Sequence, residues 1–443
     1  MKAVFLTAGA AGMYCGSCMH DNALARALRD AGVDCVLQPV YTPIRTDSQS
    51  VATDQVFLGG IHIYLLQQMP WLRRVPAPLL RPLNWPPLIR WATQRAGTTD
   101  AAKLAELSLS MLRGVHGRQA VEVKRLIDWF ADEMKPDAIV LSNLLIGGAL
   151  PQIRDRLPHA KIVVLLQGDD IFLDHLPEPS RAEAIKLCAD LIRHVDCVIV
   201  HSQFYADKMA ALLSIPREKL VITPLSIDLS PFEAATVSVD TPSSDPPSSD
   251  LPANTENCFR LGYLARIAPE KGLHHLVDAF ITLATQPQHR DLTLHVAGWL
   301  GQQNREYFQA QIQKIADAGL SDRFTHHGSP DLDGKTAFLK SLDLLSVPAD
   351  YEDPKGLFIL EALAAGVPVV QPHHGAFIEL IESTGGGVTF APGNVESLAD
   401  VIHHLKHDSA RLTSLGKTGQ ANVRAKHSID QAAIQMRQLL FGS

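Results

Sequence analysis

Residues 262–272 read Gly-Tyr-Leu-Ala-Arg-Ile-Ala-Pro-Glu-Lys-Gly. They connect a short apolar run, which predicts a β-strand over residues 259–264, to a helical pattern that begins at Gly272. On the connecting loop, Arg266 offers a planar guanidinium and Lys271 a mobile point charge. A solvent-exposed loop also carries such charges, but the glycine and proline residues around them favour a site for a diphosphate. The stretch therefore indicates an α/β fold with an anion site at the end of a strand.

Residues 351–368 carry the second motif, Tyr-Glu-Asp-Pro-Lys-Gly-Leu-Phe-Ile-Leu-Glu-Ala-Leu-Ala-Ala-Gly-Val-Pro. Gly356 starts a predicted short helix, and Gly366 with the proline that soon follows ends it. The N-terminus of this helix favours an anion. Apolar residues bury one side of the helix, so the carboxylates of Asp353 and Glu361 are left to accept hydrogen bonds from hydroxyl groups, as sugars require.

Short apolar runs alternate with longer helical patterns in both halves of the chain, which is typical of parallel sheets with helices on both faces. We therefore predict two Rossmann-like, doubly wound α/β lobes that face each other across a cleft. The predicted strands cover residues 3–7, 35–38, 138–142, 162–166, 197–201 and 220–223 in the first lobe, and residues 259–264, 292–297, 324–327, 344–347 and 367–370 in the second.

The domain boundary is predicted from composition. Residues 233–257 include TPSSDPPSSDLPAN, which is rich in proline and serine and has no aromatic residue, so we expect a disordered linker. An N-terminal lobe over residues 1–232 and a C-terminal lobe over residues 258–443 follow from this. Whether the last helix packs back on the N-terminal lobe stays open. The ligand site of such a protein usually lies between its lobes.

Composition excludes several classes of protein. The chain has 443 residues, 46% of them hydrophobic, and a net charge of −7, so a nucleic-acid partner held by a basic face is not expected. No apolar run approaches the roughly 20 residues of a membrane-spanning helix. The six cysteines are mostly scattered and do not suggest a disulfide framework, which favours a cytoplasmic protein.

The first predicted strand leads into a loop with Gly9, Gly12 and Gly16. Such a loop can bring backbone amides to a ligand, although glycines also serve tight turns. The spacing is not that of a dinucleotide site, and the second strand ends without an acidic residue. We therefore expect a polar ligand at this loop, but not a dinucleotide.

Two groups of residues raise the question of metal or redox chemistry. Cys15 and Cys18 form a Cys-Gly-Ser-Cys stretch near His20, and His403 and His407 stand at helical i, i+4 spacing. The first group shows no fourth ligand nearby, and the second shows no carboxylate partner or His-Glu-x-x-His context. We interpret both as packing or solvated residues, and expect no metal and no cofactor.

Taken together, the motifs resemble those of the retaining glycosyltransferases of family 4 (group 1), which have the two-lobed GT-B fold. The family's "GR..peKG" motif matches residues 266–272, and its "E.fG...lEa.a.G.PvV" motif matches residues 353–370. The segments "gg..E" and "p.gid...f" match residues 375–379 and 224–232. The resemblance covers most of the chain.

The resemblance implies a nucleotide-sugar donor in the C-terminal lobe. Arg266 and Lys271 would hold its diphosphate, Glu361 its ribose, and Asp353 the sugar hydroxyls. The spacing of the motif leads to Asp353, one methylene shorter than the family's Glu, while Glu352 precedes it and is the alternative if the loop bulges. Together with these residues, the expected donor site includes Gly356, Leu357, Glu352, Gly375 and Glu379.

On the acceptor side the resemblance points to Gly16, Gln167 and Asp169. Many members of the family carry a histidine just after the fourth strand, where this chain reads Leu-Leu-Gln-Gly-Asp-Asp over residues 165–170. Glutamine cannot act as a general base. Gln167 or Asp169 could instead position the donor or the acceptor.

These observations predict a metal-independent hexosyltransferase that moves a sugar from a nucleoside diphosphate to an acceptor, with retention of configuration as the resemblance implies. The acceptor would be a carbohydrate, a lipid-linked molecule or a small molecule. Two alternatives remain: a GT-B nucleotide-sugar epimerase or hydrolase, and a non-catalytic protein that binds nucleotide sugars.

One unusual segment lies outside all of these motifs. Residues 57–91 hold three of the five tryptophans, four arginines and many prolines, so a long irregular excursion is predicted. It would pack on its own lobe, cover the acceptor as a lid, or make weak peripheral contact with an anionic membrane surface.

We expect the triple substitution of Trp71, Arg73 and Arg74 by alanine to weaken use of the acceptor and to leave donor affinity nearly unchanged, because the donor motifs all lie in the other lobe. Calorimetric titration with the donor and steady-state kinetics with the acceptor, on the same variant, separate the two effects. Equal weakening of both would mean that the segment supports the fold, and unchanged acceptor kinetics would favour a packed insertion.

Overall fold

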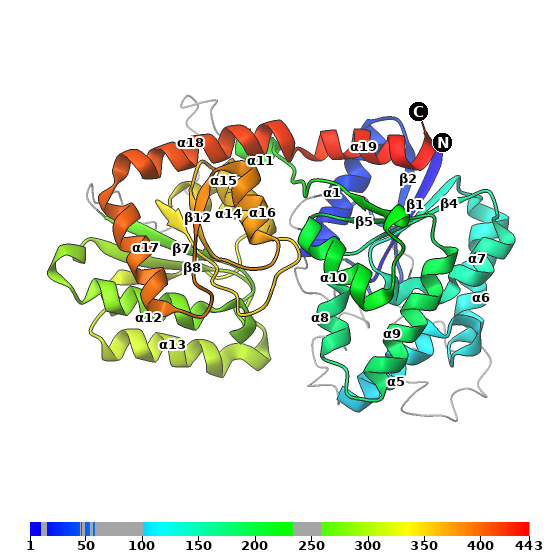
Figure 1. Cartoon of the computed structure of the whole chain (residues 1–443), viewed down its shortest axis with the longest axis horizontal. Coiled ribbons are helices and arrows are strands. Elements are labelled where there is room, and N and C mark those ends of the chain that lie inside the picture. The colour runs from blue at the N-terminus through cyan, green and yellow to red at the C-terminus, as the bar shows by residue number, and fades with distance from the viewer. Residues whose placement is uncertain are drawn as a thin grey trace, which may run out of the picture. The chain divides into compact units, whose positions relative to one another are not determined.

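The computed structural model describes residues 1–9, 16–44, 46, 49–53, 56–57, 101–233 and 258–442. It divides into two compact units (Figure 1). Unit 1 contains Met1–Leu225 and Ile429–Ser443, and unit 2 contains Ser226–Ser428. Each unit has a six-stranded sheet in which all neighbouring strands run parallel. The prediction of two doubly wound α/β lobes is confirmed.

The sheet of unit 1 has the order β2-β1-β3-β4-β5-β6. Its strands are β1 (Lys2–Thr7), β2 (Asp34–Pro39), β3 (Ala138–Leu141), β4 (Lys161–Leu165), β5 (Cys197–Val200) and β6 (Leu220–Ile222). Its helices are α1 (Gly16–Asp30), α5 (Ala101–Leu112), α6 (Ala120–Asp128), α7 (Leu150–Arg156), α8 (Asp169–Asp174), α9 (Ser180–Leu191), α10 (Gln203–Leu213) and α19 (Ile429–Phe441).

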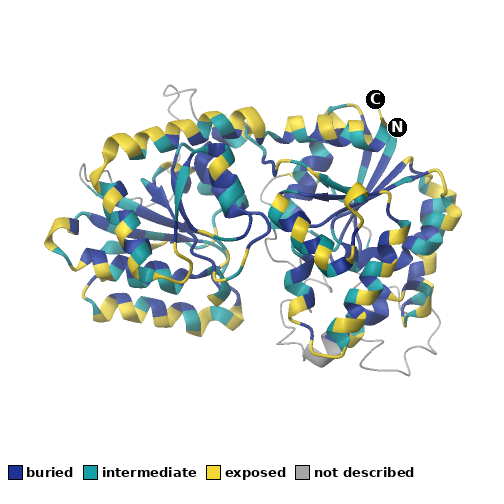
Figure 2. Ribbon diagram, viewed as in Figure 1, coloured by how far each residue is buried: buried dark blue, intermediate teal, exposed yellow. Residues whose placement is uncertain are grey.

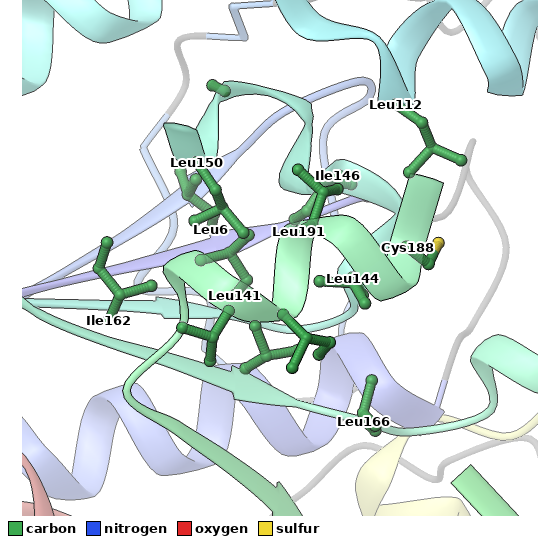
Figure 3. Packing of buried hydrophobic residues seen from close by; sticks show 14 of the residues in the cluster. Leu6, Leu112, Leu141, Leu144, Ile146, Leu150, Ile162, Leu166, Cys188 and Leu191 are labelled. Atoms are coloured by element: carbon green, nitrogen blue, oxygen red, sulfur yellow. The ribbon is translucent and has the colours of Figure 1, made fainter. Parts of the chain in front are cut away.

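Both faces of this sheet are buried. In β1, Phe5 belongs to the core cluster that includes residues of α1 and α19, whereas Leu6 belongs to the cluster on the opposite face. Figure 3 shows part of the second cluster, in which Leu6, Leu141 and Leu150 lie together. Successive side chains of a strand point to opposite faces, so a strand covered on both sides must be apolar throughout. This is why the strands read as continuous apolar runs.

The sheet of unit 2 has the order β12-β11-β10-β7-β8-β9. Its strands are β7 (Phe259–Leu264), β8 (Leu292–Ala297), β9 (Phe324–His326), β10 (Leu344–Leu345), β11 (Val369–Pro372) and β12 (Gly387–Phe390). Its helices are α11 (Ser230–Glu233), α12 (Leu273–Ala284), α13 (Arg305–Asp317), α14 (Leu332–Lys340), α15 (Leu357–Ala364), α16 (Phe377–Thr384), α17 (Val395–His407) and α18 (Ser409–Lys426). Figure 2 shows buried strands and helices that expose one side.

The boundaries of the units differ in detail from the predicted domains. The division falls between Leu225 and Ser226 and not after residue 232. The short helix α11 goes with unit 2, where Lys340 Nζ donates to the carbonyl of Phe232 at 3.2 Å. The last helix, α19, goes with unit 1, which the sequence had left open. Of the predicted linker, residues 234–257 lie outside the described residues, as do residues 58–91 of the tryptophan-rich segment.

Among the described residues, no helix is both long enough and apolar enough to cross a membrane.

The chain returns to unit 1 through α19, whose apolar side packs on α1. Met436 is buried there with Leu24, Leu28 and Leu440, whereas Ile434 on the same helix is 55% exposed. We expect Met436→Ala to lower the free energy of unfolding by about 2–5 kcal/mol, because it leaves a cavity in this core.

Ile434→Ala is the matched control, and we expect it to stay within about 0.5 kcal/mol of the native chain because its side chain is mostly in water. Urea unfolding followed by circular dichroism measures both. Equal stability of the two variants would show that α19 contributes little to unit 1.

Candidate functional site

The site begins with the loop that follows β7. A 3₁₀ turn at Pro269–Lys271 (η9) leads into α12 through Gly272, whose φ is 72°. A Cβ atom on Gly272 would lie 1.7 Å from the carbonyl oxygen of Pro348. Only glycine therefore fits this turn, and the turn fixes the position of the neighbouring Lys271 backbone.

Lys271 forms an ion pair with Asp353, at 2.7 Å from Nζ to Oδ2. The side chains are only 15% and 8% exposed, respectively. Tyr351 completes the group, because its hydroxyl accepts from Lys271 Nζ and donates to Asp353 Oδ2 at 2.9 Å. The other oxygen of Asp353 accepts from the backbone N–H of Lys355 at 2.9 Å. Asp353 is thus engaged by protein groups on both oxygens, and it orients Lys271.

Electrostatics keeps this carboxylate charged. Burial by itself would raise the pKa of Asp353, but the Lys271 ammonium and the hydrogen bonds from Lys271, Lys355 and Tyr351 lower it to about 2. Burial, with Asp353 alongside, raises the pKa of Tyr351 well above its usual value, so its hydroxyl stays protonated as a donor. The carboxylate of Asp353 therefore stays ionised at neutral pH.

Arg266 lies on the same loop in a different environment. Its guanidinium donates to Glu270 Oε1 at 2.6 Å, and the two side chains are 40% and 45% exposed. The hydroxyl of buried Tyr263 donates to the carbonyl oxygens of Arg266 and Lys271, at 3.2 Å and 3.4 Å, so the loop backbone is anchored. Exposed ion pairs contribute little free energy, so Arg266 can exchange Glu270 for an anionic ligand at small cost.

Helix α15 starts as predicted. Gly356 has a φ of 80° and precedes Leu357, the first residue of the helix. Glu361, one turn further, is 16% exposed and its Oε1 lies 2.7 Å from Nζ of Lys335, on α14. Glu361, the residue predicted to bind the ribose, is therefore paired with Lys335, which the sequence motifs did not single out.

The loop after β11 contacts the loop after β10, which carries Asp353. Gly375 has a φ of 58°, and a Cβ atom there would lie 2.9 Å from the backbone nitrogen of Asp353. The N–H of Ala376 donates to the carbonyl of Asp353 at 2.9 Å, which brings α16 and its first-turn residue Glu379 to this loop. Glu352, in contrast to Asp353, is exposed.

Sheet order explains why these segments meet. The loops with Lys271, Asp353 and Gly375 follow β7, β10 and β11, which are neighbours in a parallel sheet. Their carboxyl ends lie at one edge of the sheet, where open α/β folds bind ligands. Sequence reasoning missed Tyr351, Lys355 and Lys335. Tyr351 and Lys355 lie within the second motif, so their position could have indicated a role. Nothing in the sequence near Lys335 marked that residue.

In unit 1, Gly16 is the first residue of α1, and Gln167 and Asp169 stand at the carboxyl end of β4. The side chain of Gln167 donates to Asp21 Oδ1 at 2.9 Å. Asp169 accepts from the N–H of Leu144 at 2.7 Å. Burial raises the pKa of Asp169 to about 7. The backbone N–H groups of Leu144 and Gln167, which donate to this carboxylate, oppose the rise. Asp21, which sequence reasoning did not single out, thus joins the two predicted residues in one buried polar group.

The glycine loop and the cysteines of unit 1 are partly described. Gly9 has a φ of 82°, and a Cβ atom there would lie 1.9 Å from the carbonyl oxygen of Thr42, which favours the tight-turn interpretation. Cys18 is buried on α1, with its Sγ 3.8 Å from the hydroxyl of Thr7. Gly12 and Cys15 lie outside the described residues.

The low pKa of Asp353 makes a prediction about stability and pH. A carboxyl group with a folded-state pKa of about 2 and an unfolded pKa of about 3.9 contributes stability that is full above the unfolded value and is lost as the pH falls through the folded value. From about pH 5 to pH 2 we expect the free energy of unfolding of the native chain to fall by up to about 2 kcal/mol more than that of Asp353→Asn.

Glu352→Gln is the control, because that carboxylate is exposed and should leave the acid dependence of the native chain unchanged. Denaturant unfolding at a series of pH values gives the three curves. Parallel curves for the native chain and Asp353→Asn would contradict the ion pair.

Part of the chain is similar in sequence to known proteins. Residues 252–422 match the family model of the glycosyl transferases group 1. The 2-deoxystreptamine glucosyltransferase of Streptomyces kanamyceticus is 29% identical over 228 residues, 52% of this chain and 56% of that protein. The lipopolysaccharide core biosynthesis mannosyltransferase LpsB of Rhizobium meliloti is 32% identical over 181 residues, 39% of this chain and 48% of that protein. The chain spans about half the length of these curated relatives.

Among solved structures, Anabaena Alr3699/HepE in complex with UDP matches with a TM-score of 0.65 and 18% identity, over 100% of both chains. This likeness concerns the fold. Residues 252–422 therefore match the family model of the glycosyl transferases group 1, within a chain of two parallel-sheet units that has the GT-B fold.

Proposed function

We propose that this protein is a retaining glycosyltransferase of family 4, which transfers a sugar from a nucleoside-diphosphate sugar to an acceptor. The observation that carries the proposal is the meeting of Lys271, Asp353 and Gly375 at the carboxyl edge of a sheet that lies within the group 1 domain. The cations of this edge suit a diphosphate, and both relatives described above are named as transferases of sugars.

The difficult step of such a transfer is departure of the nucleoside diphosphate, whose negative charge grows as the glycosidic bond breaks. Lys271 is fixed in advance by Asp353 and Tyr351, so it needs no reorganisation to stabilise that charge. Arg266, near the surface, would leave Glu270 and close on the diphosphate. The N-terminus of α15, at Gly356 and Leu357, adds backbone N–H groups aimed at an anion. These cations supply the charge that a metal would otherwise supply.

The remaining expected contacts are assigned as follows. Glu361, oriented by Lys335, would accept hydrogen bonds from the ribose. Since both oxygens of Asp353 are engaged by protein groups, its main role here is to position Lys271, and the sugar hydroxyls would also meet Glu352 and Glu379 on the adjoining segments. Retention of configuration rests on the family 4 resemblance, and nuclear magnetic resonance of the product anomer tests it.

For the acceptor we propose a carbohydrate, lipid-linked or small molecule, met by unit 1 through Gln167, Asp169 and the start of α1 at Gly16. We also propose a cytoplasmic location, which subcellular fractionation tests. The buried hydrogen bond from Gln167 to Asp21 suits a residue that positions a ligand and not a base.

Incubation with a panel of labelled nucleotide sugars tests the function. A transferred sugar on an added acceptor supports glycosyl transfer. Free sugar or an altered sugar nucleotide, formed without an acceptor, would instead indicate the hydrolase or epimerase. Binding without turnover would indicate a non-catalytic protein.

We expect Arg266→Ala to lower turnover by roughly 100-fold or more while the fold survives, because loss of one hydrogen-bond donor to the developing charge typically costs that much. Arg424→Ala is the matched control: Arg424 is exposed on α18, and we expect unchanged turnover. Steady-state kinetics with a saturating acceptor measures both. Near-normal turnover of purified Arg266→Ala would contradict the diphosphate assignment of this loop.

A further inference from the structure

Three histidines from two segments of unit 2 meet at one place. His289 ends the 3₁₀ turn Pro287–His289 (η10), and His403 and His407 lie one turn apart on α17. The sequence showed only the spacing of the last two, because His289 is more than one hundred residues away in the chain. Packing of α17 on α12, which η10 follows, brings the third ring to them.

The ring nitrogens are arranged as ligands need to be. His289 Nε2 lies 2.9 Å from His403 Nδ1, and one nitrogen from each of the three rings falls within 4.8 Å of the others. In a tetrahedral zinc site with Zn–N distances of about 2.0–2.1 Å, ligand nitrogens lie about 3.3–3.4 Å apart. Small rotations of the two partly accessible rings on α17 therefore bring the three nitrogens to ligand spacing.

One hydrogen bond orients the His407 ring. His407 Nδ1 lies 2.8 Å from the carbonyl oxygen of His403, so this nitrogen carries the proton and the Nε2 lone pair is directed elsewhere. Lys406, a cation on the same helix, is paired with Asp291 at 2.8 Å.

His289 has an unmet polar requirement. The residue is fully buried, and its Nδ1 has no hydrogen-bond partner in the part of the chain that the structure describes. Its other nitrogen, Nε2, lies 2.9 Å from His403 Nδ1, a distance at which one ring donates a proton to the other. A cation bound between these two nitrogens would take the place of that shared proton.

The cluster is remote from the candidate donor site. His289 lies before the amino end of β8, and Phe259, at the amino end of the neighbouring β7, has Lys406 of α17 over its ring at 5.9 Å. Arg266 and Lys271 follow the carboxyl end of β7. A six-residue strand at about 3.3 Å per residue separates the two edges of the sheet by roughly 20 Å.

We propose that His289, His403 and His407 form a binding site for a divalent transition metal of the zinc type, which fastens α17 to the segment that precedes β8. Three imidazoles leave a fourth position for water. At this distance from the diphosphate loop the ion stabilises unit 2 and takes no part in group transfer. The proposal is thus independent of the proposed function.

The test uses the full chain after removal of metals with a chelator. Titration with Co²⁺, followed by its visible absorption, reports tetrahedral nitrogen coordination, and calorimetry with Zn²⁺ gives the affinity and the stoichiometry. We expect His403→Gln and His407→Gln each to weaken Zn²⁺ binding at this site by at least about tenfold, since each removes one of three ligands. Both side chains are accessible, so the fold should tolerate the changes.

His404→Gln is the matched control, because His404 is exposed on the same helix and is not one of the three clustered residues. It should bind Zn²⁺ like the native chain. At free Zn²⁺ of about 100 times the native dissociation constant, the thermal midpoint of the native chain and of His404→Gln should rise by about 5 °C or more, and that of His403→Gln by about half as much or less.

Three results would overturn the proposal: no saturable Zn²⁺ binding by the native chain, equal binding by His403→Gln and the native chain, or equal loss in His404→Gln. A second group on unit 2, His274, His275 and Asp350, also has its ligand atoms within 4.8 Å. His275→Gln separates the two groups. Loss of all Zn²⁺ binding in that variant would place the metal there and not at His289.

Discussion

The buried ion pair between Lys271 and Asp353 is the constraint on which the candidate site depends. A charge at this depth is costly unless it is paired and hydrogen-bonded, and here each partner makes the other tolerable. Tyr351 fills the remaining position around the pair. Removing either charge would leave the other unpaired, so the loops after β7 and β10 are fixed relative to each other before any ligand arrives.

Backbone geometry reinforces that constraint. Gly272 sits where a Cβ atom would collide with the carbonyl of Pro348, and Gly375 sits against the backbone of Asp353. The three loops therefore interlock through glycines that no other residue replaces without movement. Because these loops follow neighbouring strands of one parallel sheet, they lie at the same edge of the sheet, where side chains far apart in the sequence come together.

Both sheets and several helix starts could be predicted from the sequence. The continuous apolar runs predicted both sheets, since strands buried on two faces need no polar alternation. Gly272 and Gly356 marked helix starts, and the spacing of the second motif singled out Asp353, which the structure pairs with Lys271. Side-chain contacts between distant parts of the chain could not be predicted. Glu361 pairs with Lys335, and Gln167 with Asp21, and no local motif marks either pair. The short β12, which begins with glycine, was also missed.

The charges at the candidate donor site are unequal in their freedom, and this gives them different roles. Arg266 and Glu270 form an exposed pair that contributes little and exchanges readily, whereas the buried pair of Lys271 and Asp353 resists separation. Under the proposed function, a diphosphate would replace Glu270 at Arg266, but would join Lys271 as an additional partner while Asp353 stays in place. The buried lysine would then set the position of the anion, and the exposed arginine would close over it.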